Sequence, residues 1–100
     1  MAEEILSVIY TDKANADSLT IKNFILFKFT QREVDNFYKM LATFERIVSA
    51  FPEIYPLSTE NQEIHRAVLS KQLSVFYSLS KDQINVIAVL DNRVGYSKWP

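Results

Sequence analysis

The sequence contains no cysteine, and it has only one glycine and one histidine among its 100 residues. Without cysteine it cannot form disulfides, thiolate zinc sites or a cysteine nucleophile. Gly95 alone cannot build a glycine-rich phosphate-binding loop, and His65 alone cannot supply a multi-histidine metal site within one chain. We therefore expect no metal and no cofactor.

Long apolar runs are also missing, since none reaches the roughly 18 residues that cross a bilayer. The opening stretch MAEEILSVIY has acidic residues where a secretory signal has basic ones. We therefore expect a cytoplasmic protein that does not associate with membranes. Nearly half of the residues are hydrophobic (48%), which is enough apolar surface for residues 1–100 to fold as a single ordered domain.

The charges are unevenly distributed along the chain. Residues 1–63 contain six Lys and Arg against ten Asp and Glu, a net charge of −4, whereas residues 64–100 contain five against two, a net charge of +3. An anionic partner is therefore expected to dock on the second part.

The first part of the chain predicts one strand and two helices. The run ILSVIY (5–10) is typical of a strand, TDKANAD (11–17) of a turn, and the apolar residues of 18–29 favour a helix. Thr30 and Glu33 form a capping-box pattern that starts a second helix. One apolar stripe with helical spacing then runs to Pro52, and its members are Val34, Phe37, Tyr38, Leu41, Phe44, Val48 and Phe51. The short link predicts an antiparallel helical hairpin.

The second part predicts a loop over 52–63 and then three strands over 64–70, 73–79 and 84–90. Links of two residues, Lys71-Gln72 and Lys81-Asp82, predict an antiparallel meander. With two-residue loops, Leu79 faces Ile84, Tyr77 faces Val86 and Val75 faces Ala88.

This register assigns the side chains to two faces of an antiparallel sheet. One face is almost wholly apolar and is expected to lie under the helices. The other, uncovered face would collect a mixed set: His65, Ala67, Leu69, Ser74, Phe76, Ser78, Asn85, Ile87, Val89, Asp91 and Arg93.

The chain resembles the RelE/ParE toxins of type II toxin–antitoxin systems. The resemblance lies in the order of strand, two helices and three antiparallel strands, and in three stretches of sequence. These stretches are FTQREVDNFYKMLATFERIVSAFPEIYP, EIHRAVLSKQLSVFYSL and INVIAVLDNR. The resemblance implies an α+β fold with the helices on one face of the sheet.

The resemblance also implies a small toxin that a co-expressed antitoxin neutralises by wrapping over its sheet and helices. RelE-like members cleave mRNA on the ribosome without a metal, and ParE-like members inhibit DNA gyrase. An inactive protein that only binds its partner is a third alternative, because His65 stands where many relatives carry an arginine.

The candidate site residues follow from the chemistry of metal-free RNA cleavage, which needs a base, an acid and cations. Arg93 is a candidate for charge stabilisation, with an ion pair to Asp91 as the alternative. His65 is a candidate base, with packing beside Phe76 as the alternative. Arg66 follows it in the sequence and is expected on the other face or at the sheet edge.

Arg66, Lys71 and Lys98 are candidates for contact with nucleic acid or another target, and Tyr96 is a third candidate for catalysis. Tyr96 could stack on a base, and the alternative is that Tyr96 and Trp99 cover the sheet edge or form surface that the antitoxin covers; Lys98 lies in the same tail. Lys71 lies in a predicted turn, where it either contacts phosphate or is simply solvated. Proteins that work on the ribosome tend to be strongly basic, and this chain has a net charge of −1. The charge therefore favours the ParE-like alternative over the nuclease.

Overall fold

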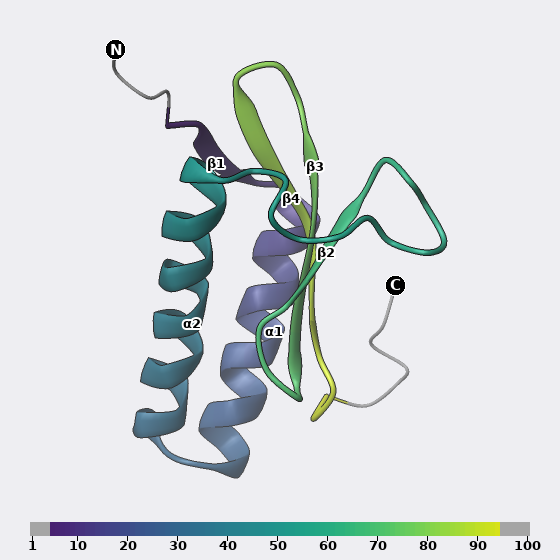
Figure 1. Cartoon of the computed structure of the whole chain (residues 1–100). Helices are drawn as coiled ribbons and strands as arrows, with labels where there is room; N and C mark the ends of the chain where they lie inside the picture. Colours follow the sequence, from purple (N-terminus) through teal and green to yellow (C-terminus); the bar gives the residue numbers. More distant parts are fainter. Residues whose placement is uncertain (1–4, 95–100) are drawn as a thin grey trace.

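The protein consists of a four-stranded sheet with two helices against one face (Figure 1). The structure is a computed structural model that describes residues 5–94. Its elements are β1 (Ser7–Tyr10), α1 (Asp12–Lys28), α2 (Gln31–Ala50), β2 (His65–Val68), β3 (Leu73–Leu79) and β4 (Gln83–Asp91). The predicted α+β fold is confirmed.

The strands are arranged in the order β1-β4-β3-β2, and the sheet is mixed. β2 pairs with β3 and β3 with β4 in antiparallel fashion, as the meander predicts, but β1 runs parallel to β4, with Ser7 opposite Gln83 and Tyr10 opposite Val86. The prediction of a wholly antiparallel sheet was therefore wrong. Parallel neighbours need a long crossover, and the two helices and the meander between β1 and β4 provide one.

Both helices begin at residues that satisfy their free N–H groups. The hydroxyl of Thr11 accepts a hydrogen bond from the Ala14 N–H at 3.1 Å, so α1 starts within the predicted turn 11–17. At α2 the predicted capping box is confirmed: the Glu33 carboxylate accepts hydrogen bonds from the Thr30 N–H at 3.3 Å and from the Thr30 hydroxyl. The hydrogen bond from the Thr30 side chain lowers the pKa of Glu33.

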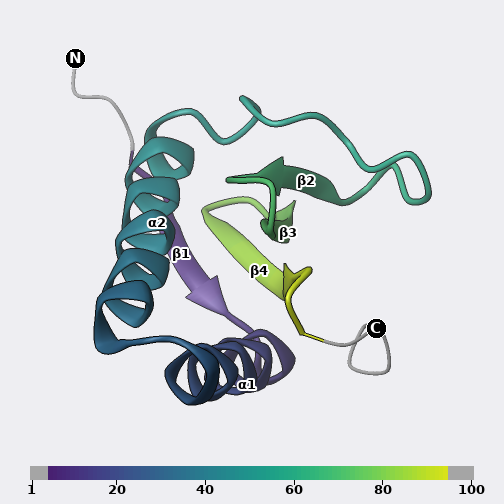
Figure 2. The ribbon, with the colours of Figure 1, turned by 90° about the horizontal axis from the view of Figure 1, so that it is seen from below.

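The core lies between the two helices and the sheet, and α1 contributes Ala14, Ile21 and Ile25 to it. The apolar stripe of α2 buries five side chains: Val34, Phe37, Leu41, Phe44 and Val48. They pack with the inward side chains of β3 and β4, among them Leu73, Val75, Tyr77, Ile84 and Val86. Tyr38 and Phe51, which were predicted as part of the stripe, are exposed. Viewed from below, α1 and α2 lie on one side of the sheet, and no helix of residues 5–94 covers the other side (Figure 2).

Two local features change the predicted faces of the strands. The turn between β2 and β3 has three residues, 70–72, instead of two, because Val68 pairs with Ser74 and the Leu69 N–H donates to the Leu73 carbonyl at 2.8 Å. The Ser70 hydroxyl accepts the N–H groups of Gln72 and Leu73, each at 3.1 Å. In β4 the pairing jumps from Val86 to Ala88 and skips Ile87, which is a β-bulge. A shift of one residue turns every later side chain to the opposite face.

Within the described part of the chain, neither helix is both long enough and apolar enough to span a membrane.

Candidate functional site

The end of β4 holds an ion pair between the buried Asp91 and the partly buried Arg93. The guanidinium of Arg93 donates from Nε to Asp91 Oδ1 at 2.9 Å and from Nη2 to Oδ2 at 2.7 Å, and its backbone N–H donates to Oδ1 at 2.8 Å. These side-chain hydrogen bonds raise the pKa of Arg93. Arg93 also lies 5.7 Å from the centre of the Phe29 ring. The alternative of an ion pair with Asp91 is therefore what the structure shows, and this carboxylate occupies two of the donors with which Arg93 would bind a phosphate.

The prediction that Asp91 and Val89 lie on the uncovered face was wrong. The predicted pairing of Val75 with Ala88 was also wrong, because Ala88 pairs with Phe76. The bulge at Ile87 moves Val89 to the helix-facing row, where it pairs with Val75. Asp91 follows it, pairs with Leu73, and is only 1% exposed. The end of β4 thus faces α1 and the tip of the helical hairpin.

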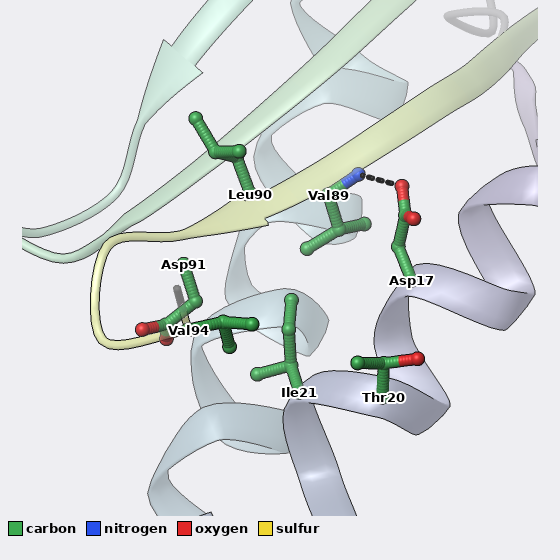
Figure 3. Close-up of a pocket in the computed structure, with 7 residues that line it drawn as sticks. All are labelled: Asp17, Thr20, Ile21, Val89, Leu90, Asp91 and Val94. Carbon is green, nitrogen blue, oxygen red and sulfur yellow. Dashed lines mark hydrogen bonds between the residues drawn. The ribbon is translucent and has the colours of Figure 1, made fainter. Parts of the chain in front are cut away.

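A small hollow separates α1 from the end of β4 (Figure 3). Its volume is about 60 Å³, and it is lined by Asp17, Thr20, Ile21, Val89, Leu90, Asp91 and Val94. Asp17 accepts the Val89 N–H at 3.1 Å and forms an ion pair with Lys13 at 2.7 Å. Asp17 thus provides a hydrogen-bond acceptor for a main-chain N–H of β4 beyond the last residue of β1. In Figure 3 the apolar side chains of Ile21, Val89 and Val94 lie between Asp17 and Asp91, so the hollow does not pair two carboxylates for acid–base chemistry.

His65 lies on the covered face, under the loop that follows α2. It pairs with Tyr77, its ring stacks on the Tyr77 ring at 4.9 Å and 11°, and it is 9% exposed. Its Nδ1 is 2.7 Å from the carbonyl oxygen of Tyr55, so that nitrogen carries the proton and donates. The prediction that His65 lies on the uncovered face was wrong, because the three-residue link turns β2 over. The alternative of packing is correct, although the partner is Tyr77 and not Phe76.

The aromatic cluster around His65 fixes the loop between α2 and β2. The Tyr77 hydroxyl donates to the carbonyl of Pro52 at 2.8 Å, and Tyr55 packs against Phe44 and Tyr77 with ring centres 5.9 and 6.3 Å away. Burial raises the pKa of Tyr77 to about 12. His65, Tyr55 and Tyr77 are thus used to hold the loop in place.

Arg66 is the cation that β2 presents on the uncovered face. It is exposed, pairs with Phe76, and its guanidinium carbon lies 5.7 Å from the centre of the Phe76 ring. No ion pair to Arg66 is found among residues 5–94. The sequence analysis placed His65 on this face instead of Arg66. The residue that could have corrected this prediction is Ser70, because its hydroxyl favours the longer turn.

Of the three remaining candidates, the structure describes only Lys71. Lys71 is exposed in the β2–β3 turn, and its carbonyl accepts the Asn92 side chain at 2.9 Å. Tyr96 and Lys98 lie outside the described residues. Within residues 5–94, no three His, Asp or Glu side chains come together in a way that would hold a metal ion.

The structural comparison gives a similar fold with low sequence identity. No protein-family model and no curated protein matches the chain. Among solved structures, the chain is similar to one described as the chromosomal ParDE TA system from P. aeruginosa, with a TM-score of 0.73 and 12% identity over 87% of this chain and 96% of that one. It also matches the conserved hypothetical protein HP0894 from Helicobacter pylori, with a TM-score of 0.47 and 7% identity over 89% of this chain and 97% of that one. The chain therefore has a RelE/ParE-like fold, as the resemblance implied.

Proposed function

We propose that this protein is the toxin of a toxin–antitoxin module. In this proposal it acts in the cytoplasm, inhibits growth by binding an essential target, and is neutralised by a cognate antitoxin. The ParE-like fold over 87% of the chain supports the toxin assignment, and the ParE branch of the resemblance makes DNA gyrase the candidate target.

The observation that favours binding over cleavage is the environment of Arg93 and His65, two of the three residues predicted as catalytic. Arg93 is held by Asp91 through two side-chain hydrogen bonds, and His65 is packed on Tyr77 with its Nδ1 bonded to Tyr55. Neither group is presented on the uncovered face, where an RNA strand would have to lie beside both. A binding surface needs no such convergence.

A RelE-like, ribosome-dependent mRNA endoribonuclease is the second candidate, and Arg66 is the observation that favours it. An exposed guanidinium above an aromatic ring is a suitable contact for phosphate and base. In this alternative Arg66 and Lys71 contact the mRNA, and Tyr96 and Lys98 complete the site.

Controlled expression in a bacterium tests both candidates in one culture. Growth arrest with intact ribosome-bound mRNA and inhibited DNA supercoiling supports the gyrase proposal. Arrest with new mRNA ends supports the nuclease. A folded protein that causes no arrest contradicts both and leaves an inactive protein that only binds its partner.

Two arginine variants make the experiment sharper. Arg66→Ala removes the cation of the uncovered face, and Arg46→Ala is its matched control because Arg46 is an exposed arginine on α2. New mRNA ends that disappear in Arg66→Ala but persist in Arg46→Ala would establish Arg66 as part of the nuclease site.

A further inference from the structure

A hollow of about 480 Å³ lies between α1 and α2 and reaches β1, and we call it the hairpin hollow. Figure 2 shows the two helices next to each other, and both of them contact β1. The hollow shares no residue with the small hollow at the end of β4. Ligand sites for small organic molecules have volumes of roughly 300–1,000 Å³. It is lined by Tyr10, Asn15, Ser18, Leu19, Tyr38, Leu41, Ala42 and Glu45.

Tyr10 and Glu45 form a polar pair in the wall of the hairpin hollow. The Tyr10 hydroxyl donates to Glu45 Oε2 at 2.6 Å. Burial raises the pKa of Tyr10, and its hydrogen bond to Glu45 acts in the same direction, so Tyr10 remains the neutral donor of the pair. Glu45 is the only charged residue that lines the hollow, and no cation of residues 5–94 forms an ion pair with it. A half-buried carboxylate without a cation favours a ligand that supplies one.

Ser18 adds a hydroxyl whose hydrogen-bonding capacity is unused. The residue is only 9% exposed. Its Oγ is the one buried side-chain oxygen or nitrogen within residues 5–94 that has no hydrogen-bond partner. A buried polar atom without a partner lowers the stability of the fold. In the wall of a hollow, such an atom points to a ligand that completes its hydrogen bonding.

The remaining walls are mostly apolar. Leu19 and Tyr38 are exposed, whereas Leu41 is buried beneath the hollow. Tyr38, which was predicted as part of the core stripe of α2, thus lines the hairpin hollow instead. Aromatic rings bury apolar surface and also attract cations at their faces. A ligand of this hollow therefore needs an apolar body in addition to its charged end.

The charge around the hairpin hollow selects the sign of the ligand. Residues 1–63, which include β1, α1 and α2, have a net charge of −4. An anion would be repelled by Glu45, and a neutral molecule would leave this carboxylate without a counter-charge. An ammonium group carries three donors and no acceptor, so it can serve the carboxylate of Glu45 and the hydroxyl of Ser18 together.

We propose that the hairpin hollow is a binding site for a small organic cation, namely an amine with an apolar body. The ammonium group pairs with Glu45 and donates to the Ser18 hydroxyl, and the apolar body lies against Leu19 and Tyr38. This inference goes beyond the proposed function and does not depend on it, because the site requires neither an antitoxin nor a toxin target.

Tryptamine is a suitable probe, because it joins an ammonium group to an aromatic body. It is titrated into the full-length protein while amide signals are followed by NMR, and changes centred on residues 15–19 and 38–45 are expected. Tryptophol has the same shape without the charge and should bind about tenfold more weakly. Indoleacetate, an anion, should bind more weakly still. The amide of Nα-acetyl-lysine imitates a lysine of a partner protein, and because it lacks the aromatic body it should also bind about tenfold more weakly.

Two variants test the polar groups of the site. Glu45→Gln keeps an acceptor for the Tyr10 hydroxyl but removes the charge, so it should weaken tryptamine binding by about tenfold and leave tryptophol binding unchanged. Asp35→Asn is the matched control, because Asp35 is an exposed acid of α2 that does not line the hollow. Ser18→Ala should weaken tryptamine binding by about threefold without lowering the unfolding midpoint of the free protein, since its hydroxyl has no partner to lose.

Four outcomes would overturn the inference. They are no signal change at millimolar tryptamine, changes centred on another surface, equal binding of tryptamine and tryptophol, and equal binding of tryptamine and the lysine derivative. The last outcome would assign the site to a side chain of a partner protein. Undiminished tryptamine binding in Glu45→Gln would remove the role of the carboxylate and would likewise overturn the proposal.

Discussion

His65 and Arg66 are adjacent in the chain, yet they belong to two different surroundings. His65 lies on the covered face of the sheet, stacked on Tyr77 and bonded to Tyr55. Arg66 lies on the uncovered face, exposed and above Phe76. His65 and Asp91 on the covered face are bonded to other parts of the protein, whereas Arg66 is exposed and has no ion-pair partner among residues 5–94. The comparison separates residues that maintain the fold from residues that the fold presents.

The largest effect is expected when the ion pair at the end of β4 is broken. Asp91→Ala leaves the Arg93 guanidinium and its N–H without their acceptor, which should lower the free energy of unfolding by roughly 3 kcal/mol. Urea denaturation checks this value. The double variant Asp91→Ala with Arg93→Ala should recover part of the loss, because no charge is left unpaired. Equal stability of the parent and Asp91→Ala would show that the pair contributes nothing.

The second prediction concerns the contribution of His65 to stability. His65→Ala removes a stacked ring and a buried hydrogen bond, so it should lower the free energy of unfolding by about 2 kcal/mol. His65→Phe keeps the ring and should recover part of that loss. Thermal unfolding of the two variants measures the difference. An unchanged stability of His65→Ala would mean that His65 does not anchor the loop, and it would again favour the prediction that His65 is a catalytic base.

How far the sequence could predict which residues face the helices depended on one turn and one β-bulge. Pro52, the Thr30–Glu33 capping box and the apolar stripe of α2 are local signals, so the helix they define was predicted closely. The pairing of Tyr77 with Val86 was also correct. The three-residue link was not predicted because the local signal at Ser70 was not used, and the bulge at Ile87 was not predicted because its placement depends on tertiary contacts. The added residue of the turn reversed the faces of His65 and Arg66, and the added residue of the bulge reversed the face of Asp91.

The parallel pairing of β1 with β4 was missed for a related reason. A four-residue strand carries no signal for its neighbour, and its position is set by contacts between distant parts of the chain. The Leu6 N–H donates to the Ser49 carbonyl at 3.1 Å, and the Thr11 N–H donates to the Val86 carbonyl at 3.0 Å. Both bonds join residues that only the completed fold brings together.

The third prediction concerns alkaline pH. The pKa of Tyr77 is raised to about 12 in the folded protein, so the neutral phenol is favoured by folding. Its contribution is fully present below the ordinary tyrosine pKa of about 10 and is lost as the pH rises through 12. Burial also raises the pKa of Tyr10, and its hydrogen bond to Glu45 acts in the same direction. Unfolding midpoints should therefore fall between pH 10 and 12, and less steeply in Tyr77→Phe. A parallel fall in the parent and the variant would contradict the assignment to Tyr77.

The smallest effect on stability is expected at Arg66. Its guanidinium is exposed and has only the Phe76 ring beneath it, so Arg66→Ala should change the free energy of unfolding by no more than about 0.5 kcal/mol. Denaturation of Arg66→Ala beside His65→Ala tests the contrast in one experiment. A large loss at Arg66 would mean that it supports the fold and would remove the basis for its availability to a partner. If stability is kept while growth arrest is lost, then two adjacent residues of one strand serve different ends, and the single residue added at Ser70 decides which is which.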